Sequence, residues 1–337
     1  MSSAHRSRPS TAAVAVALLL VYVVWGSTYL GIAIMIETLP PLLAAGFRYT
    51  TAGLLMLGAL VAHARLRRNA EPLERPTAAH WRSAFIVGTL LLLGGNGGVV
   101  LAELYIPSGV AAVLIATMPI WLALFDALLT RRRPSRLVVG GLIAGIVGVG
   151  ILLAPLEELD RINPIGIGLI VIAEISWAAG SIYARRAPLP RSALLGTGLE
   201  MLAGGLVLAA AGGLLGEVGR TNVETFSVRS LVAVAYLIVF GSLVAFTAYT
   251  WLLANVPVST VGTYAYVNPI VAVALGAIIL REPVTLRTLL ASAIIIGAVV
   301  AMVSGRPREA EEAGPSPDAA PLEPANGGTD SAATSRP

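Results

Sequence analysis

Long apolar segments separated by short polar ones run along this chain from about residue 12 to about residue 303. Ten of them have roughly the 17 to 25 residues that a helix needs to cross about 30 Å of hydrocarbon. We predict helices at Ala12–Met35, Pro40–Ala62, Ala84–Leu104, Ser108–Leu129, Leu137–Ala154, Ile165–Tyr183, Ala193–Leu215, Leu231–Leu253, Val258–Leu280 and Leu286–Val303. Because a backbone in lipid must satisfy its own hydrogen bonds, closely spaced spans predict an all-α membrane protein folded as a compact bundle.

This pattern occurs twice. Trp25 is matched by Trp177, 152 residues later, and Pro119 is matched by Pro269, 150 residues later. Each copy contains five apolar segments. Because five is odd, the second copy enters the membrane from the side opposite to the first, which predicts an inverted-topology repeat of the kind that secondary transporters use.

Four regions follow from the repeat. The two copies occupy residues 12–155 and 164–303, an N-terminal segment of residues 1–11 precedes them, and a tail of residues 304–337 follows. The tail is rich in Pro, Ala, Gly, Glu and Asp. Such a composition cannot bury a core, so we predict that the tail is disordered.

Composition narrows the class of function. Of 337 residues, 56% are hydrophobic and 12% are charged, whereas soluble domains carry roughly 25% charged residues. Cysteine is absent and all 23 basic residues are arginine, which excludes thiolate metal sites, P-loops and Schiff-base lysines. The three histidines, His5, His63 and His80, lie outside the predicted spans. We therefore expect no metal, no cofactor and no enzyme activity, and a membrane-embedded enzyme is the disfavoured alternative.

The arginines predict the orientation. Sixteen of them fall on the side of the N-terminus: Arg6, Arg8, Arg65, Arg67, Arg68, Arg75, Arg82, Arg131, Arg132, Arg133, Arg136, Arg185, Arg186, Arg191, Arg306 and Arg308. The opposite side receives five: Arg161, Arg220, Arg229, Arg281 and Arg287. By the positive-inside rule both termini are cytoplasmic. The basic start also resembles a signal peptide, but no small-residue cleavage site follows it. The pI near 9.7 favours attraction to anionic lipid of the bilayer and not nucleic-acid binding.

Several short motifs carry a family resemblance. They are Trp25-Gly26-Ser27-Thr28-Tyr29, Gly46-Phe47-Arg48-Tyr49, Gly94-Gly95-Asn96-Gly97-Gly98, Pro107-Ser108-Gly109-Val110-Ala111-Ala112, Ile175-Ser176-Trp177-Ala178, Leu199-Glu200-Met201-Leu202 and Tyr264-Ala265-Tyr266-Val267-Asn268-Pro269. The chain resembles the EamA-domain transporters of the drug/metabolite transporter superfamily, in its ten-helix, YedA-like exporter branch. The resemblance implies two five-helix EamA repeats around a central cavity and export of a small molecule across the bacterial inner membrane.

Three ionisable residues fall deep inside predicted spans, where a charge costs about 2.5 to 3.5 kcal/mol on insertion scales. Arg48 and Glu200 occupy equivalent positions of the two copies, and Glu174 lies three residues before Trp177 on the same helix face. Arg48 is a candidate to bind an anionic substrate group or Glu200, and a permanent ion pair between the copies is the alternative. Glu174 and Glu200 are candidate proton-coupling groups, whereas Glu103 and Asp126 lie near span ends, where we expect them to be solvated.

Aromatic and polar residues suggest the wall of a substrate cavity. Trp25 and Trp177 sit away from the expected interfaces, and packing is the alternative to cavity lining. Thr260, Tyr264 and Asn268 recur every four residues and so share one helix face. Their equivalents in the first copy are the apolar residues Val110, Leu114 and Met118, so we expect an amphipathic cargo. Interhelical hydrogen bonding is the alternative role for this polar face.

Proline and glycine mark places where helices bend or approach one another. Pro119 and Pro269 each fall in mid-span and are candidate hinges, with a static kink as the alternative. The glycine run around Asn96 predicts a close helix contact or a break, and the Asn96 amide is a candidate substrate contact. Gly141 and Gly145 form a small-residue ridge that packs within the chain or in a homodimer.

The favoured hypothesis is a secondary exporter of small amphipathic metabolites or drugs, amino acids among them, working by alternating access. Proton antiport and facilitated diffusion both fit this sequence. An importer or organic-phosphate exchanger of the same fold is a further alternative, but a phosphate cavity would be expected to present several cations, and Arg48 is the single mid-span arginine.

Overall fold

The computed structural model describes residues 10–66, 73–130, 136–153, 163–256 and 264–304, and within these ranges it contains helices and no strand. Six helices are long and apolar enough to cross a membrane: Thr11–Met35, Pro41–Leu66, Ala78–Ala102, Pro164–Ala184, Ala193–Leu214 and Val228–Leu252. Four shorter apolar helices lie at Ser108–Leu122, Val139–Gly148, Val267–Leu280 and Leu286–Gly297. The all-α prediction is confirmed, and the count of ten spans stays a prediction.

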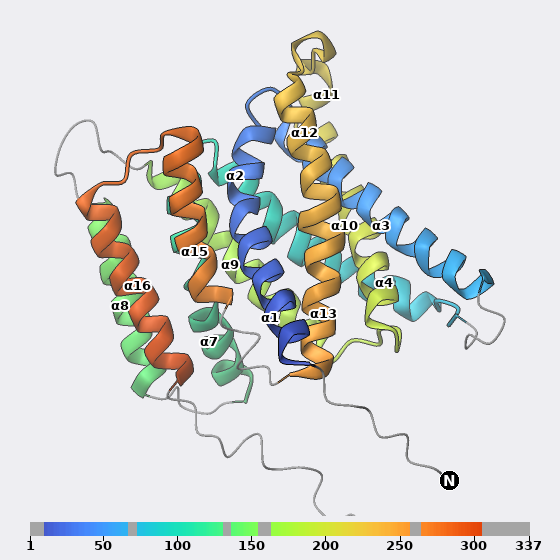
Figure 1. Cartoon of the computed structure of the whole chain (residues 1–337), viewed down its shortest axis with the longest axis horizontal. Coiled ribbons are helices and arrows are strands. Elements are labelled where there is room, and N and C mark those ends of the chain that lie inside the picture. Colours follow the sequence, from blue (N-terminus) through green and yellow to red (C-terminus); the bar gives the residue numbers. More distant parts are fainter. Residues whose placement is uncertain (1–9, 67–72, 131–135, 154–162, 257–263, 305–337) are drawn as a thin grey trace, which may run out of the picture. The chain divides into compact units, whose positions relative to one another are not determined.

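The described part of the first copy contains ten helical elements (Figure 1). They are α1 Thr11–Leu20, η1 Val21–Trp25, α2 Gly26–Met35, α3 Pro41–Leu66, α4 Ala78–Gly88, η2 Thr89–Gly97, α5 Gly98–Ala102, the pair α6 Ser108–Ile115 and α7 Met118–Thr130, and α8 Arg136–Leu153. The elements η1 and η2 are π-helical stretches inside otherwise α-helical spans. Helix starts follow capping chemistry, since the side chain of Ser10 accepts from Ala13 N and that of Thr77 from His80 N.

The second copy is built in the same order. Its elements are α9 Pro164–Ala184, α10 Ala193–Leu214, α11 Glu217–Arg220, η4 Val223–Thr225, α12 Val228–Tyr236, η5 Leu237–Val244, α13 Ala245–Asn255, α15 Tyr264–Leu275, η6 Gly276–Leu280 and α16 Leu286–Ser304. The element η5, like η2, is a π-helical stretch in the third long helix of its copy. The two copies therefore share this distortion, and such distortions are frequent at functional sites.

The two mid-span prolines have different effects. Between α6 and α7 the helix is interrupted at Ala116 and Thr117, just before Pro119, which lies in the first turn of α7. By contrast, α15 continues through Pro269. The bend predicted at Pro119 is thus a break in the helix. Whether either position moves as a hinge stays a prediction.

The long helices α3 and α10 cross where small residues let their backbones touch. A Cβ on Gly46 would lie 2.6 Å from the backbone N of Ala209, and one on Gly53 would lie 2.6 Å from that of Leu202. Shifting these contacts by the repeat spacing of 152 gives Gly198 against Leu57 and Gly205 against Thr50. Both contacts are present. The crossing is therefore antiparallel and maps onto itself when the two copies are exchanged.

Other helix contacts also recur when each helix is replaced by its equivalent in the other copy. The contact of α2 with α15 has its equivalent in that of α9 with α7, and the contacts of α2 with α12 and of α1 with α13 have theirs in the packing of α9 against α4 and α5. The pair α8 with α16 maps onto itself. Figure 1 shows α8 and α16 side by side. Two inverted copies packed about a two-fold axis would give this set of contacts.

Candidate functional site

Trp25, at the end of η1, lies in an aromatic cluster supplied by the second copy. Its ring centroid is 5.0 Å from that of Tyr249, 5.2 Å from that of Tyr264 and 5.9 Å from that of Phe246. The indole Nε1 donates to the carbonyl oxygen of Gly241 at 3.2 Å. The π-helical stretch η5 provides this acceptor, so the distortion of one copy positions the tryptophan of the other.

Arg48 of α3 is buried beside the same stretch. Its Nε donates to the hydroxyl of Ser242 at 3.1 Å, and its guanidinium carbon lies 4.5 Å from the ring centroid of Tyr49. The neighbouring Ser27 hydroxyl donates to the carbonyl of Val24 and shares a hydrogen bond with the Tyr236 hydroxyl at 2.5 Å. These contacts join η1, α2 and α3 of the first copy to α12 and η5 of the second.

Arg48 and Glu200 do not form an ion pair in this structure. The salt bridges found between described residues join Arg229 with Glu37 and His80 with Glu74. At the crossing of α3 and α10, the contacts of Gly46 and Gly53 place Arg48 level with about residue 207 of α10, seven positions from Glu200. At a rise of 1.5 Å per residue this is about 10 Å. Inverted symmetry places equivalent residues on opposite sides of the two-fold axis, which explains the separation.

Glu174 of α9 binds the broken helix of the first copy. Its carboxylate accepts from the Thr117 hydroxyl at 2.8 and 2.9 Å and from the Trp121 Nε1 at 2.9 Å. The Glu174 side chain is 2% exposed. Thr117 is one of the two residues at the break between α6 and α7, so Glu174 ties the second copy to the point where this helix is interrupted.

Asn268 occupies the equivalent helix contact in the other half of the molecule. In the amide orientation that satisfies both of its groups, its nitrogen donates to the carbonyl oxygens of Tyr22 and Tyr264, each at 3.1 Å. Tyr22 belongs to η1, and position 22 is equivalent to Glu174 at the repeat spacing of 152. The first span of each copy thus packs against the proline-containing helix of the other copy through a polar contact. Asn268 bonds to Tyr22 in one case, and Glu174 bonds to Thr117 in the other.

Trp177 and Asn96 form a second group with Glu174 on α9 and η2. The ring of Trp177 covers Gly95, where a Cβ would lie 2.6 Å from Cε3 of the indole. Gly94 similarly contacts Ser176, whose hydroxyl donates to the carbonyl of Leu90 at 2.8 Å. The Asn96 amide donates to Leu91 O within its own helix at 3.4 Å. The close helix contact predicted from the glycine run is confirmed.

The predicted site residues therefore fall into two groups and one separate residue. Trp25, Arg48, Tyr264 and Asn268 gather around η1, η5 and α15, whereas Trp177, Asn96 and Glu174 gather around α9 and η2. Glu200 lies apart on α10, where its backbone carbonyl approaches Gly88. Thr260 lies outside the described residues.

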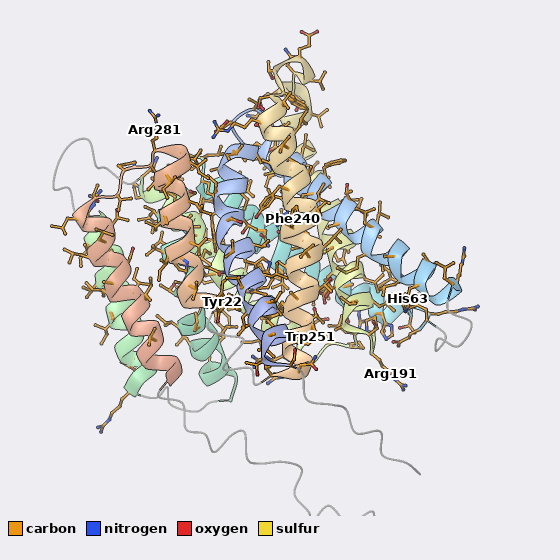
Figure 2. The ribbon with its side chains drawn as sticks, viewed as in Figure 1. Tyr22, His63, Arg191, Phe240, Trp251 and Arg281 are labelled. Carbon is orange, nitrogen blue, oxygen red and sulfur yellow. The ribbon has the colours of Figure 1, made fainter. Side chains whose placement is uncertain are left out.

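Two carboxylates that the sequence analysis missed cap helices of the opposite copy. Glu217 accepts from the backbone N–H groups of Leu42 at 3.1 Å and Leu43 at 2.8 Å, at the start of α3. Glu282 accepts from Ser108 N and Ser108 Oγ, each at 2.8 Å, and from Gly109 N at 3.1 Å, at the start of α6. We call the end of the bundle that carries Glu217 and Glu282 the cap end. Figure 2 shows Arg281, which precedes Glu282, and Arg191 at opposite ends of the molecule.

Further contacts join the copies at the cap end. Ser227 N donates to the Thr38 hydroxyl at 3.1 Å, and the Ser230 hydroxyl donates to Ile34 O at 2.7 Å. At the opposite end, Arg191 N donates to Glu74 at 2.8 Å in an exposed position. The expectation that Glu103 is solvated is wrong, because the turn after α5 buries both of its carboxyl oxygens. The side chain of Asp126 lies outside the described part of the chain.

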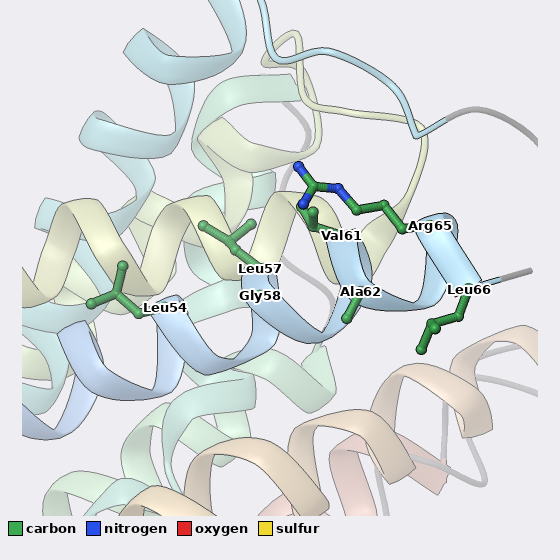
Figure 3. A pocket seen from close by; sticks show the side chains of 7 residues that line it. All are labelled: Leu54, Leu57, Gly58, Val61, Ala62, Arg65 and Leu66. Carbon is green, nitrogen blue, oxygen red and sulfur yellow. The ribbon is translucent and has the colours of Figure 1, made fainter.

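A surface hollow lies along the C-terminal part of α3, away from these groups (Figure 3). It is lined by residues of this one helix: Leu54, Leu57, Gly58, Val61, Ala62, Arg65 and Leu66. None of the predicted site residues contributes to it. Large exposed apolar side chains such as Leu54 and Leu66 are what a helix facing lipid would present.

Comparison with known proteins places this architecture in a family. The profile of the EamA-like transporter family matches the chain twice, over residues 12–154 and 164–304. The protein named uncharacterized inner membrane transporter YedA, from Escherichia coli strain K12, is 40% identical over 291 residues, covering 86% of this chain and 90% of that protein. Protein PecM of Dickeya dadantii is 27% identical, covering 82% of this chain and 88% of its own.

A solved crystal structure shares the fold. Its TM-score is 0.56 at 20% sequence identity, with 87% of this chain and 96% of that chain covered. The two profile matches coincide with the two sets of helices whose contacts exchange across the α3 and α10 crossing. The chain belongs to the EamA-like transporter family.

Proposed function

We propose that this protein is a secondary exporter of small amphipathic metabolites or drugs, amino acids among them, in the bacterial inner membrane. In this proposal ten spans form two inverted five-helix repeats that alternate access to a site between them, with both termini cytoplasmic. Family membership and the inner-membrane relative support transport. The exchange of equivalent helix contacts supports the inverted repeat.

The observation that carries the proposal is the uneven linkage between the copies. Their crossing at α3 and α10 is symmetric, but Glu217 and Glu282 of the second copy cap helices of the first at one end. The repeat equivalent of Glu282 at a spacing of 150 is Arg132, which cannot accept from helix N–H groups. Among the described residues, the link found at the opposite end is the exposed contact of Arg191 N with Glu74. The two ends are thus linked unevenly, an asymmetry that alternating access needs.

The site is assigned to the two groups described above. Trp25, Tyr264 and Asn268, with Thr260, would contact the apolar body and hydrogen-bonding groups of the cargo, and Arg48 would bind an anionic group. Trp177 and Asn96 would contribute from the second group. Glu174 and Glu200 are the candidate proton-coupling carboxylates, and Pro119 and Pro269 the candidate hinges.

Transport into sealed, reconstituted vesicles tests the function. A panel of amino acids, dyes and cationic drugs should include compounds whose uptake requires the protein and rises with an imposed pH gradient. Glu174→Gln and Glu200→Gln should each be tested against Glu224→Gln, which alters an exposed carboxylate. Uptake that ignores the gradient, with both variants transporting normally, would show a facilitator without proton coupling.

Thiol labelling tests alternating access directly, because the native chain has no cysteine. A cysteine replacing the buried Leu114 of α6 should react slowly with a membrane-impermeant thiol reagent, whereas one replacing Val218 of α11, which is 64% exposed, should react quickly. Adding Glu217→Ala and Glu282→Ala should speed the reaction at Leu114→Cys from the cap end. Equal rates with and without the two substitutions would contradict the proposed closure at this end. A C-terminal tag accessible from outside intact cells would overturn the orientation.

A further inference from the structure

Glu103 is a buried carboxyl group without a partner. It follows α5, and its backbone N donates to Val99 O at 3.0 Å, so it continues the end of that helix. Both of its carboxyl oxygens are buried and neither has a hydrogen-bond partner. The turn it belongs to packs against the start of α9, where a Cβ on Gly166 would lie 2.6 Å from the side chain of Ile106.

The charged neighbour of Glu103 is a second carboxylate. Glu282, in the turn between η6 and α16, caps α6 at Ser108, five residues after Glu103, so its carboxylate lies at the same turn. From α2, the phenol of Tyr29 is the other titratable group that Glu103 influences. The salt bridges between described residues do not include Glu103.

The two carboxyl groups have opposite environments. Glu282 accepts three hydrogen bonds, two of them from backbone N–H groups at the start of α6, and a helix N-terminus favours a negative charge there. Glu103 receives no donor and faces that negative charge, and both conditions disfavour its ionised form. The two carboxyl groups at the cap end therefore differ in their partners, since Glu282 has three donors and the Glu103 oxygens have none.

We propose that Glu103 is a proton-binding site whose occupancy depends on the cap that Glu282 makes on α6. In the conformation seen here the Glu103 carboxyl group carries a proton. When the cap end opens, water reaches the carboxyl group, its O–H bond breaks, the proton passes to water and the carboxylate remains. The link between proton release and opening rests on the alternating access proposed above, whereas proton binding in this conformation does not.

Labelling with dicyclohexylcarbodiimide tests the site without a known substrate, because this reagent modifies protonated carboxyl groups in apolar surroundings. The acid O–H adds across a C=N bond of the reagent, and rearrangement leaves a stable N-acylurea that peptide mass spectrometry locates. In the purified full-length protein, Glu103 should be modified near neutral pH, and modification should fall as pH rises. The exposed Glu224 is the internal control and should stay unmodified. Absence of modification at Glu103 while other buried carboxyl groups react would overturn the proposal.

Variants of Glu282 sharpen this test. Glu282→Gln removes the negative charge and weakens the cap, so modification of Glu103 should disappear at a lower pH than in the wild type. Glu282→Asp keeps the charge and should leave the profile of Glu103 close to that of the wild type. A profile that is identical in Glu282→Gln and the wild type would show that the two carboxyl groups are independent, against the proposal.

Thermal unfolding in detergent gives a second readout. Glutamate in an unfolded chain ionises near pH 4.3, so a Glu103 that is protonated when folded stabilises the protein at low pH and destabilises it as pH rises. The Tm of the wild type should fall between about pH 6 and about pH 9 by more than that of Glu103→Gln. If the Tm of the wild type and that of Glu103→Gln changed equally with pH, the proposal that Glu103 binds a proton would be overturned. Failure of the transport function would leave the labelling and Tm results unchanged, so the two proposals are tested separately.

Discussion

Trp25 and Trp177 occupy equivalent positions of the two copies, yet their surroundings differ. Trp25 lies among three aromatic rings and donates to the carbonyl of Gly241 in η5. Trp177 packs against Gly95 of η2, in the equivalent helix, and Glu174 on the same helix accepts a hydrogen bond from Thr117 at the break between α6 and α7. The repeat has kept the backbone framework and the tryptophan while the residues around it have diverged. The two tryptophans therefore share a position in the repeat but differ in their contacts.

The largest expected effect comes from breaking the framework that both groups share. Gly53→Val and Gly205→Val each place a side chain against a backbone across the α3 and α10 crossing. Overpacking costs about 1 to 3 kcal/mol where neighbours can adjust. Here a Cβ would lie within 2.6 Å of a backbone atom, so we expect each loss to exceed the roughly 5 kcal/mol of a large Trp→Ala change. Because the sites are equivalent, the two losses of thermal stability in detergent should be similar. Gly58→Val on α3 is the matched control, since a Cβ there meets nothing within 4 Å. A large loss in only one of the two glycine variants would contradict the symmetric crossing.

Removing the aromatic group of the first tryptophan should have the next largest effect. Trp25→Ala should cost about 3 to 5 kcal/mol, because it deletes a large ring that packs against three others. Trp25→Phe keeps the ring packing but loses the bond to Gly241 O and should cost about 1 kcal/mol. For Trp177 the described contacts include no hydrogen bond of the indole, so Trp177→Phe should cost less than Trp25→Phe. Unfolding monitored by circular dichroism measures both, and equal costs would remove this distinction between the groups.

Removing the carboxyl group of Glu174, which bonds to the break between α6 and α7, should have an intermediate effect on stability. Glu174→Ala leaves the Thr117 hydroxyl and the Trp121 N–H without their acceptor, and buried donors without a partner cost about 1 to 3 kcal/mol. Glu174→Gln retains an acceptor and should cost less. Thermal unfolding measures the stability, and Glu37→Gln at an exposed site is the control. If the alanine variant is as stable as the wild type, Glu174 does not hold the break.

The smallest expected effect comes from comparing two buried serines. The hydroxyl of Ser242 has a hydrogen-bond partner and that of Ser83 has none. Ser242→Ala removes the acceptor of the Arg48 Nε and should cost about 1 kcal/mol. The hydroxyl of Ser83 is buried without a hydrogen-bond partner, so Ser83→Ala should be neutral or stabilising. The difference in Tm between these two variants measures what the η5 contact contributes. No difference would place Arg48 outside the first group.

The spans were predictable because bilayer thickness fixes their length. Most observed helix ends lie within a few residues of those expected from the apolar pattern. The third helix begins at Ala78, six residues before the predicted start, because Thr77 caps a first turn that carries His80 and Arg82. Hydropathy overlooks such a turn, since its residues are polar. The π-helical stretches were equally invisible, because no residue type specifies them.

Candidate site residues that share one helix face could be predicted from their spacing. The distance between residues on two different helices could be predicted less well. Tyr264 and Asn268 were found from their spacing of four. Pairing Arg48 with Glu200 assumed that equivalent residues meet, which an inverted repeat allows only near its axis. Glu217 and Glu282 were missed because their partners are backbone N–H groups, which no sequence pattern displays. Glu103 was misjudged because its burial depends on the turn that packs on α9.

The self-matching crossing of α3 and α10 has a consequence for the origin of the chain. A surface that meets its own equivalent across a two-fold axis is isologous, the type of contact that joins identical subunits. Two separate five-helix chains of opposite orientation could make this contact before any linker joined them. In a homodimer every substitution changes both sides at once. Joining the two units in one polypeptide removes that constraint, so that Glu282 can arise in one unit while Arg132 stands in the other.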